Sequence, residues 1–262
     1  MFCSTPATVD AGDPLLALTQ GQNYLARVHE AILGIAMATD AAQVLQGLND
    51  AIGHMGADVS AWCTCIEEAH GRGAYRYLLA CDPRWCLEYE QNRAFLHDPW
   101  LAYGRRHADP ILARDIPTAN AEQRAVVDLA QAFGFKSTVV VPVPAGNGIR
   151  RVGVLYLGSA TSSFFESAGY PTFSIVARSL GSELQAWWLR AMRARLIEDW
   201  RLTDLELLLL ARERQGVGSK KIARELGSPV GTIDCRISRI MARLGVANRK
   251  AAAELAAEYG II

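Results

Sequence analysis

The residues in the first half of the chain that could do chemistry are cysteines and one aspartate among aromatic side chains. Two cysteine pairs, Cys63/Cys65 and Cys81/Cys86, are close enough in sequence to be considered as metal ligands. Their spacing does not match the C-x2–4-C pairs of structural zinc sites. In a chain without a secretory leader, reduced and buried thiols are the expected state. The sequence therefore predicts neither a metal site nor a cofactor.

The sequence carries none of the common catalytic signatures. It has no P-loop, no G-x-G-x-x-G, no G-x-S-x-G and no H-E-x-x-H, and its five histidines are scattered. A thiol–histidine catalyst built on Cys86 would rest on residue type alone. Because no acid–base constellation can be assembled, we expect a binding protein and not an enzyme.

A more informative group consists of Trp85, Tyr89 and Asp98. A buried aspartate needs a hydrogen-bond donor, and a buried indole N–H needs an acceptor. An amide-bearing small molecule with a polar head would supply both. In the alternative interpretation, Asp98 caps a short helix that begins at Pro99, and Trp85 is an ordinary core residue.

The charge distribution points to a different function for the last sixty residues. The net formal charge of the whole chain is zero, but from Trp200 onward there are 11 Lys/Arg against 7 Asp/Glu. This segment therefore carries +4 and the remainder −4. A small basic module joined to an acidic body is typical of a DNA-binding domain attached to a domain with another role.

Four helices are predicted in the basic segment. Thr203 and Ser219 are expected to cap the first two, and Gly216 and Gly245 to end the first and the third. Gly227 makes a tight turn, after which Ser228 and Pro229 begin the third helix. Two short helices joined by such a turn are typical of a helix-turn-helix. The expected helices are 204–215, 219–226, 230–244 and 249–259.

The third helix separates an apolar stripe from a polar face. The stripe is formed by Ile233, Ile237, Ile240 and Leu244. On the other face, residues near the N-terminus could reach base edges, and the basic side chains could contact phosphates. The alternative is a small helical bundle with an ordinary solvated basic face. The expected DNA contacts are Lys220, Lys221, Val230, Gly231, Thr232, Asp234, Cys235, Arg236, Ser238, Arg239 and Arg243.

The N-terminal part is predicted to be an α/β/α sandwich with an antiparallel sheet. Residues 1–14 have the composition of a loose arm. Helices are expected at 22–37, 40–55, 83–96, 120–135 and 171–195, and strands at 59–67, 74–80, 137–143 and 152–159, with turns at 70–73 and around 145–150. The whole chain is thus of the α+β class, with a sensing and dimerisation domain over 15–195 and an all-α four-helix domain over 200–262. The boundary is expected at 196–200. Sandwiches of this kind often enclose a ligand cavity.

The C-terminal segment resembles the LuxR-type, or GerE-type, helix-turn-helix. The resemblance rests on L-T-x-x-E from Leu202, on I-A-x-x-L-G-S-x-x-T-I from Ile222, and on R-L-G-V-x-N-R from Arg243, and it covers essentially all of 200–262. Asp234 departs from the family, in which several members carry a basic or polar side chain at that position. A carboxylate there repels phosphate but can accept a hydrogen bond from cytosine N4.

The N-terminal part resembles the autoinducer-binding domain of the quorum-sensing LuxR receptors over about 20–190. The resemblance rests on Trp85-x-x-x-Tyr89, Asp98-Pro99 and the segment F-G-F-K-S that begins at Phe133. It implies a bound N-acyl-homoserine lactone. Trp85 would donate to the lactone carbonyl, Asp98 would accept from the amide N–H, and Tyr89 would pack along the acyl chain.

Four positions depart from that family. Cys81 stands in place of a tyrosine, Ala113 in place of a second tryptophan and Thr138 in place of a glycine, whereas Trp100 is larger than usual. An unusual lactone, a signal of another chemistry and the absence of any signal therefore remain open. The expected ligand-binding residues are Trp85, Tyr89, Asp98, Trp100, Cys81, Ala113 and Tyr156.

These features predict a cytoplasmic transcription regulator that binds double-stranded DNA. No stretch reaches the 18 or so apolar residues of a membrane helix, and the N-terminus lacks a signal peptide. We expect a homodimer on an inverted repeat with half-sites about 10 bp apart. The alternative is a ligand-independent regulator or anti-activator that acts through protein contacts. The stripe of Leu184, Trp187, Trp188 and Met192 could be a dimer seam or intradomain core.

Overall fold

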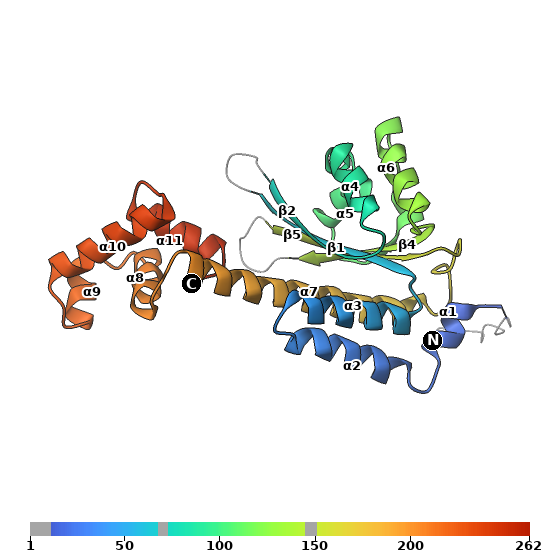
Figure 1. Ribbon diagram of the computed structural model, residues 1–262, viewed down its shortest axis with the longest axis horizontal. Coiled ribbons are helices and arrows are strands. Elements are labelled where there is room, and N and C mark those ends of the chain that lie inside the picture. Colours follow the sequence, from blue (N-terminus) through green and yellow to red (C-terminus); the bar gives the residue numbers. More distant parts are fainter. Residues whose placement is uncertain (1–11, 68–72, 145–150) are drawn as a thin grey trace, which may run out of the picture. The chain divides into compact units, whose positions relative to one another are not determined.

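A five-stranded antiparallel sheet organises the N-terminal part of the chain (Figure 1). Its strands are β1 (Val59–Glu67), β2 (Gly73–Ala80), β3 (Ile111–Leu112), β4 (Ser137–Pro144) and β5 (Arg151–Ser159), in the order β2-β1-β5-β4-β3. The two predicted strand pairs, β1 with β2 and β4 with β5, are confirmed. β3 was not predicted, because two residues are too few to show an alternating pattern.

The computed structural model describes residues 12–67, 73–144 and 151–262. The predicted turn around 145–150, and all but Gly73 of the turn at 70–73, lie outside the described residues. The chain divides into two units, of which the first ends at Trp187 and the second runs from Trp188 to Ile262. The division falls inside the long helix α7 (Tyr170–Asp199), whereas the sequence placed it near the end of that helix.

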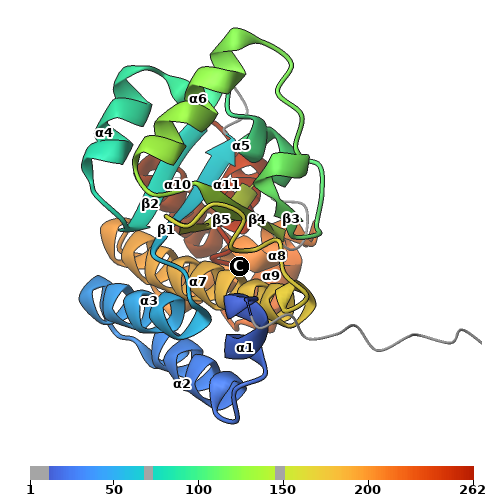
Figure 2. The same ribbon diagram turned by 90° about the vertical axis from the view of Figure 1, so that its right-hand side faces the viewer.

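Helices cover both faces of the sheet, which confirms the predicted α/β/α sandwich (Figures 1 and 2). One face carries α3 (Ala41–Met55) and the first part of α7, and α2 (Tyr24–Met37) packs on the outer side of α3. The other carries α4 (Arg84–Gln91), α5 (Pro99–Gly104) and α6 (Ala121–Ala132). Because side chains alternate along a strand, Val154 and Tyr156 of β5 face the α4–α6 layer, and Leu155 faces α7.

The ends of the helices follow from local hydrogen bonds. Asp40 and Asn120 cap α3 and α6 through their side chains, as the sequence predicts. Asp13 caps a short helix, α1 (Pro14–Thr19), which begins at the last residue of the expected loose arm. The helix predicted over 83–96 stops at Gln91, since Arg93 takes a left-handed conformation before a short 3-10 helix, η1 (Ala94–Leu96). A second 3-10 helix, η2 (Ala113–Asp115), follows β3.

The second unit contains α8 (Asp204–Arg214), α9 (Ser219–Glu225), α10 (Val230–Leu244) and α11 (Arg249–Glu258). Thr203 caps α8 in a capping box with Glu206, and Gly245 ends α10 in a left-handed conformation. The predicted side-chain caps at Ser219 and Ser228 are wrong: Gly218 and Pro229 occupy these N-cap positions. The expected stripe of α10 is buried at Ile233, Ile237 and Ile240 and half-buried at Leu244. Among the helices of the described ranges, none combines the length and apolar character needed to span a membrane.

A close approach between α7 and the sheet makes the first unit sensitive at Gly181. A Cβ atom added there would lie 2.8 Å from Val143 Cγ2, whereas one added at Gly34 of α2 would meet nothing within 4 Å. We expect Gly181→Ala to lower the free energy of unfolding by about 1–3 kcal/mol through overpacking. Gly34→Ala should leave it unchanged or raise it by about 0.5–1 kcal/mol. Urea unfolding of the two variants and the parent checks this, and equal midpoints would contradict the close packing of α7.

Candidate functional site

An aromatic core lies between the sheet and the α4–α6 layer. It brings together Trp85 and Tyr89 of α4, Trp100 of α5, Tyr156 of β5 and Phe135, all less than 5% exposed. The ring centroids of Trp85 lie 5.2 Å from Tyr89 and 5.6 Å from Phe135, and those of Trp100 and Tyr156 lie 5.7 Å apart. Two other predicted ligand residues, Cys81 and Ala113, are half-buried against this core.

The carboxyl group of Asp98 is buried beside the aromatic core. Its Oδ1 accepts hydrogen bonds from the backbone N–H groups of Trp100 (2.8 Å) and Leu101 (3.0 Å) and so caps α5. Its Oδ2 accepts one from the Tyr89 hydroxyl at 2.7 Å. Burial raises the pKa of Asp98, and these hydrogen bonds act in the opposite direction. The structure thus shows the contact of the alternative interpretation, in which Asp98 caps α5. Tyr89 donates a hydrogen bond to Asp98 in addition to packing in the core.

Two other polar groups of the core are not satisfied in this way. Within the described part of the chain, the indole N–H groups of Trp85 and Trp100 have no hydrogen-bond partner, whereas the Tyr156 hydroxyl lies close to the Asp98 carboxyl. Burial, followed by the nearby charge of Asp98, raises the pKa of Tyr156 well above its ordinary value, so this hydroxyl stays protonated. A buried donor without an acceptor costs about 1–3 kcal/mol. The core is therefore rich in donors.

A small cavity of about 80 Å³ opens at one end of the aromatic core. Trp100, Ala113, Phe135 and Thr138 are among its lining residues. Ligand pockets commonly have about 300–1,000 Å³, so the cavity has room for only part of a ligand. Cys81 does not line it, and burial raises the pKa of its thiol to about 12, which keeps the thiol neutral.

A shallow basic groove lies on the exposed face of α10 in the second unit. It is lined by Gly231, Thr232, Cys235, Arg236 and Arg239. Neither arginine forms an ion pair with any side chain of the described residues. The other predicted DNA contacts with exposed side chains are Lys220, Lys221, Val230 and Ser238.

Asp234 lies within an internal network and not in that groove. Its Oδ1 accepts from the Ser219 hydroxyl at 2.7 Å and from Arg249 at 3.1 Å. Arg249 also donates to Ser219 and pairs with Glu213 of α8, at 2.8 and 3.2 Å. The hydrogen bond from Ser219, and next that from Arg249, lower the pKa of Asp234. The network joins α8, α9, α10 and the start of α11.

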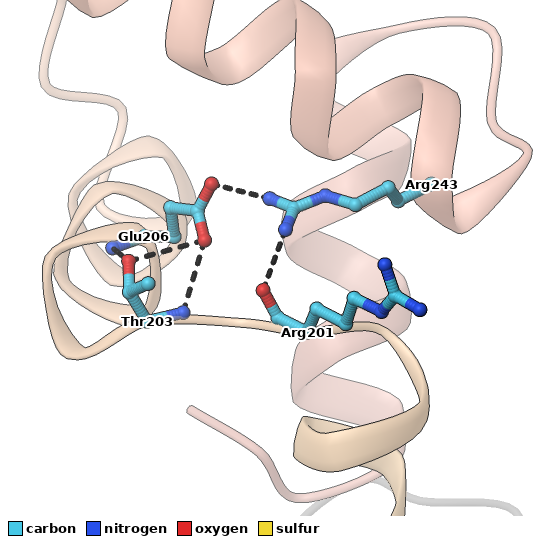
Figure 3. Close-up of polar contacts among 4 residues, drawn as sticks. All are labelled: Arg201, Thr203, Glu206 and Arg243. Atoms are coloured by element: carbon cyan, nitrogen blue, oxygen red, sulfur yellow. Dashed lines mark hydrogen bonds and ion pairs between the residues drawn. The ribbon is translucent and has the colours of Figure 1, made fainter.

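Arg243 is engaged inside the second unit as well (Figure 3). Its guanidinium pairs with Glu206 and donates to the Arg201 carbonyl, while Glu206 also accepts from the Thr203 backbone N–H at 2.9 Å. Burial alone would raise the pKa of Glu206, but the hydrogen bonds from Thr203 and Arg243 outweigh it and lower that pKa. The structure gives Arg243 an internal partner, in contrast to the free guanidinium groups of Arg236 and Arg239.

Residues 40–182 match the autoinducer binding domain family, which is more than half of the chain. The chain belongs to this family. Autoinducer-binding domains are binding modules and not enzymes, in agreement with the sequence analysis. Among the described residues, no three histidine, cysteine or acidic side chains converge as a metal site would require.

Solved structures similar to this member of the autoinducer binding domain family include those of SdiA and of a LuxR family transcription factor. Escherichia coli SdiA has 16% sequence identity and a TM-score of 0.67, with 91% of this chain and 99% of SdiA covered. SdiA in complex with octanoyl-rac-glycerol gives a TM-score of 0.62 at 16% identity, covering 92% and 98%. CepR2 of Burkholderia cenocepacia, an N-acylhomoserine lactone dependent LuxR family transcription factor, gives 0.51 at 17% identity, covering 63% and 99%. No curated protein matches the sequence.

Sequence reasoning missed several residues of both sites. Phe135 was placed in a helix end and not recognised as a member of the aromatic core, where its ring packs against Trp85. Glu206 could have been found, because Thr203-x-x-Glu206 is a capping-box pattern. Ser219 and Arg249 carried no such signal, since they meet Asp234 only after three helices have packed.

The Tyr89 hydroxyl should contribute measurably to the stability of the autoinducer-binding domain. Tyr89→Phe leaves the buried Asp98 with one donor fewer, so we expect unfolding to become easier by about 1–3 kcal/mol. Tyr103→Phe is the matched control, because that hydroxyl donates to the exposed Asp109 carbonyl at 2.9 Å, and its loss should cost at most about 1 kcal/mol. Urea unfolding measures both. A Tyr89 variant as stable as the control would show that Asp98 does not depend on this hydrogen bond.

The Arg243–Glu206 pair should stabilise the second unit, whereas the exposed Arg239 should not. Arg243→Ala leaves a largely buried carboxylate unpaired, and we expect a loss of about 1–3 kcal/mol at neutral pH. Arg239→Ala should stay within about 0.5 kcal/mol of the parent. Because the pKa of Glu206 is lowered from 4.5, the contribution of the pair is present above pH 4.5 and is lost as the pH falls below it. Thermal unfolding at pH 7 and pH 4 tests this; a deficit in Arg243→Ala that does not shrink at pH 4 argues against the pair.

Proposed function

We propose that the chain is a transcription regulator of the quorum-sensing type, in which the aromatic core binds a small molecule and the second unit binds double-stranded DNA. Membership of the autoinducer-binding family and a fold similar to SdiA and CepR2 support the first part. The order of helices in the second unit, with α9 and α10 joined by a turn at Gly227, supports a LuxR-type helix-turn-helix.

The observation that carries the DNA-binding proposal is the separation of charges in the second unit. Glu206, Glu213 and Asp234 each pair with an arginine inside the unit. The exposed face of α10 keeps Arg236 and Arg239 free, and α9 presents two exposed lysines. Such a face attracts phosphate without nearby uncompensated carboxylates.

The roles within this interface follow from what each side chain already contacts. We assign phosphate contacts to Lys220, Lys221, Arg236 and Arg239. Base contacts are assigned to Thr232 and Cys235, with Val230, Gly231 and Ser238 at their edges, because the N-terminal part of a recognition helix enters the major groove. Asp234 and Arg243 hold α10 in place instead of touching DNA, because their polar groups have partners within the unit.

The ligand we propose is an N-acyl-homoserine lactone or a related neutral amphiphile, such as the octanoyl-rac-glycerol bound by SdiA. Trp85 would donate to a carbonyl of its head group. A neutral ligand suits this apolar core, because a charged one would have to be buried beside the already buried carboxyl group of Asp98, which is costly. We further propose a homodimer on an inverted repeat with half-sites about one helical turn, ~10 bp, apart.

A ligand-independent regulator is the second candidate function. It is favoured by Asp98, whose oxygens both have donors from the chain itself, and by the small cavity. Extraction of the purified full-length chain followed by mass spectrometry separates the two candidates. A stoichiometric amphiphile supports the sensor, whereas a folded dimer that carries nothing and binds DNA equally with and without added acyl compounds supports the second candidate.

The proposed phosphate contact of Arg236 can be tested through salt dependence. A duplex is first selected from a random library with the full-length chain. We then expect Arg236→Ala to weaken binding to both selected and unselected duplexes and to flatten the slope of log K against log salt by about 0.9. The matched control is Lys250→Ala on α11, which removes an exposed positive charge outside the groove and should leave the slope unchanged.

Two results would contradict this assignment. If Arg236→Ala and Lys250→Ala change the slope equally, the effect is that of total charge and not of a phosphate contact. If the parent chain selects no duplex and binds DNA with micromolar or weaker affinity at all sequences, the DNA-binding proposal itself fails.

A further inference from the structure

We propose that Arg249 is a specificity-determining residue of the second unit, which acts without touching DNA by fixing α10 relative to α9 through Asp234 and Ser219. This inference rests on the proposed DNA-binding function and adds to it the means by which phosphate and base contacts are held in register. Without this connection, we expect the phosphate contacts to remain and the discrimination between base sequences to fall.

The guanidinium of Arg249 uses both of its terminal nitrogens for this connection. Its Nη1 donates to the Ser219 hydroxyl at 2.8 Å and to Glu213 at 3.2 Å, and its Nη2 donates to Asp234 Oδ1 at 3.1 Å. The Ser219 hydroxyl in turn donates to the same Oδ1 at 2.7 Å. Ser219, Asp234 and Arg249 thus form a closed triangle of hydrogen bonds that joins α9, α10 and the start of α11.

The triangle adjoins both kinds of proposed DNA contact. Ser219 directly precedes Lys220 and Lys221, which are exposed on α9. Asp234 directly precedes Cys235, which lines the groove of α10. Phosphate contacts position a protein on the duplex and base contacts specify the sequence. Both are made together only if α9 and α10 keep one relative orientation, and the triangle joins the two helices at the residues next to these contacts.

The apolar contacts between α9 and α10 define this orientation less closely. Ile222 of α9 belongs to the same core as Ile233 and Ile237 of α10, but apolar contacts are non-directional. The hydrogen bonds of a planar guanidinium are directional, and the single nitrogen of a lysine does not reproduce them. The side chains of Arg249 and Asp234 are 42% and 46% exposed, so their pair adds little to stability. Its main consequence is therefore geometric.

The first experiment removes the fork of Arg249 and keeps its charge. Dissociation constants are measured for the duplex selected with the full-length parent chain and for an unselected duplex. We expect Arg249→Lys to weaken binding to the selected duplex by roughly tenfold, the effect of one lost hydrogen bond. Binding to the unselected duplex should stay within about twofold of the parent, with the same salt slope. The matched control is Lys250→Ala at the next residue, which pairs with Glu254 of its own helix and should keep the parent's ratio of the two constants.

This ratio separates positioning from a loss of folded protein, because a partly unfolded variant loses affinity for both duplexes by the same factor. Asp234→Asn keeps an oxygen that accepts from Ser219 and Arg249, and its ratio should match the parent's within about threefold. Asp234→Ala should lower the ratio by roughly tenfold. Combined with Arg249→Lys, it should lower the ratio no further than the larger single effect, because both variants break the same contact.

A base contact made by Asp234 itself would give a different pattern. Duplexes in which each base pair of the selected site is changed in turn show where discrimination is lost. A displaced α10 reduces discrimination at several positions, whereas the loss of one base contact reduces it at a single position. We expect the first pattern for Asp234→Ala and for Arg249→Lys.

Ser219→Ala covers the case in which Arg249→Lys does not fold. It removes one donor to Asp234 without a change of charge and should lower the ratio by about threefold or more. The inference is overturned if a folded Arg249→Lys or Ser219→Ala keeps the parent's ratio, if the effects of Asp234→Ala and Arg249→Lys add, or if Asp234→Ala loses discrimination at one position only. These results leave the DNA-binding proposal standing, because the parent has then selected a duplex. A parent that selects no duplex refutes both.

Discussion

The burial of one carboxylate is the constraint on which the N-terminal unit depends. Asp98 lies in an apolar core, where an ionised group is unfavourable unless several donors surround it. The first turn of α5 supplies two backbone N–H groups, and α4 supplies the Tyr89 hydroxyl. α4 and α5 must therefore meet at this point, and the 3-10 turn at Ala94–Leu96, with Arg93 left-handed before it, lets the chain reverse between them. The same arrangement holds Trp85 and Trp100 against the sheet.

The second unit also depends on carboxylates that are paired with donors, and here the donors are arginine side chains. Its acidic side chains at positions 206, 213 and 234 pair with Arg243 and Arg249, while the exposed lysines of α9 and Arg236 and Arg239 of α10 form no ion pair among the described residues. The internal pairs are partly buried and so are less weakened by salt than surface pairs. The proposed DNA-binding function would need this division, because the fold must survive when the free cations are drawn to phosphate.

Local patterns were sufficient to predict most of the helices and strands. Alternation gave β1, β2, β4 and β5, and side-chain caps at Asp40, Asn120 and Thr203 gave the starts of three helices. The break at Arg93 was missed because nothing in the helical pattern of 83–96 shows that Asp98 must turn back toward Tyr89. For the same reason, the residue types indicated which aromatic side chains belong to the core but not which of them are in contact with one another. Ser219 was taken for a cap because its use by Asp234 depends on how α9 and α10 pack.

The unpaired indoles connect ligand binding to folding in the N-terminal unit. The Asp98 contacts hold the core together, but it contains two indole N–H groups that have no partner among the described residues. A ligand of the proposed sensing function that accepted hydrogen bonds from these indoles would remove the penalty of their unpaired burial only in the folded state, because in the unfolded chain both indoles are hydrated. At a hundredfold excess over the dissociation constant it would stabilise the fold by about 2.7 kcal/mol. The proposed ligand would therefore act on the stability of the α4–α5 layer, which the Asp98 contacts hold together.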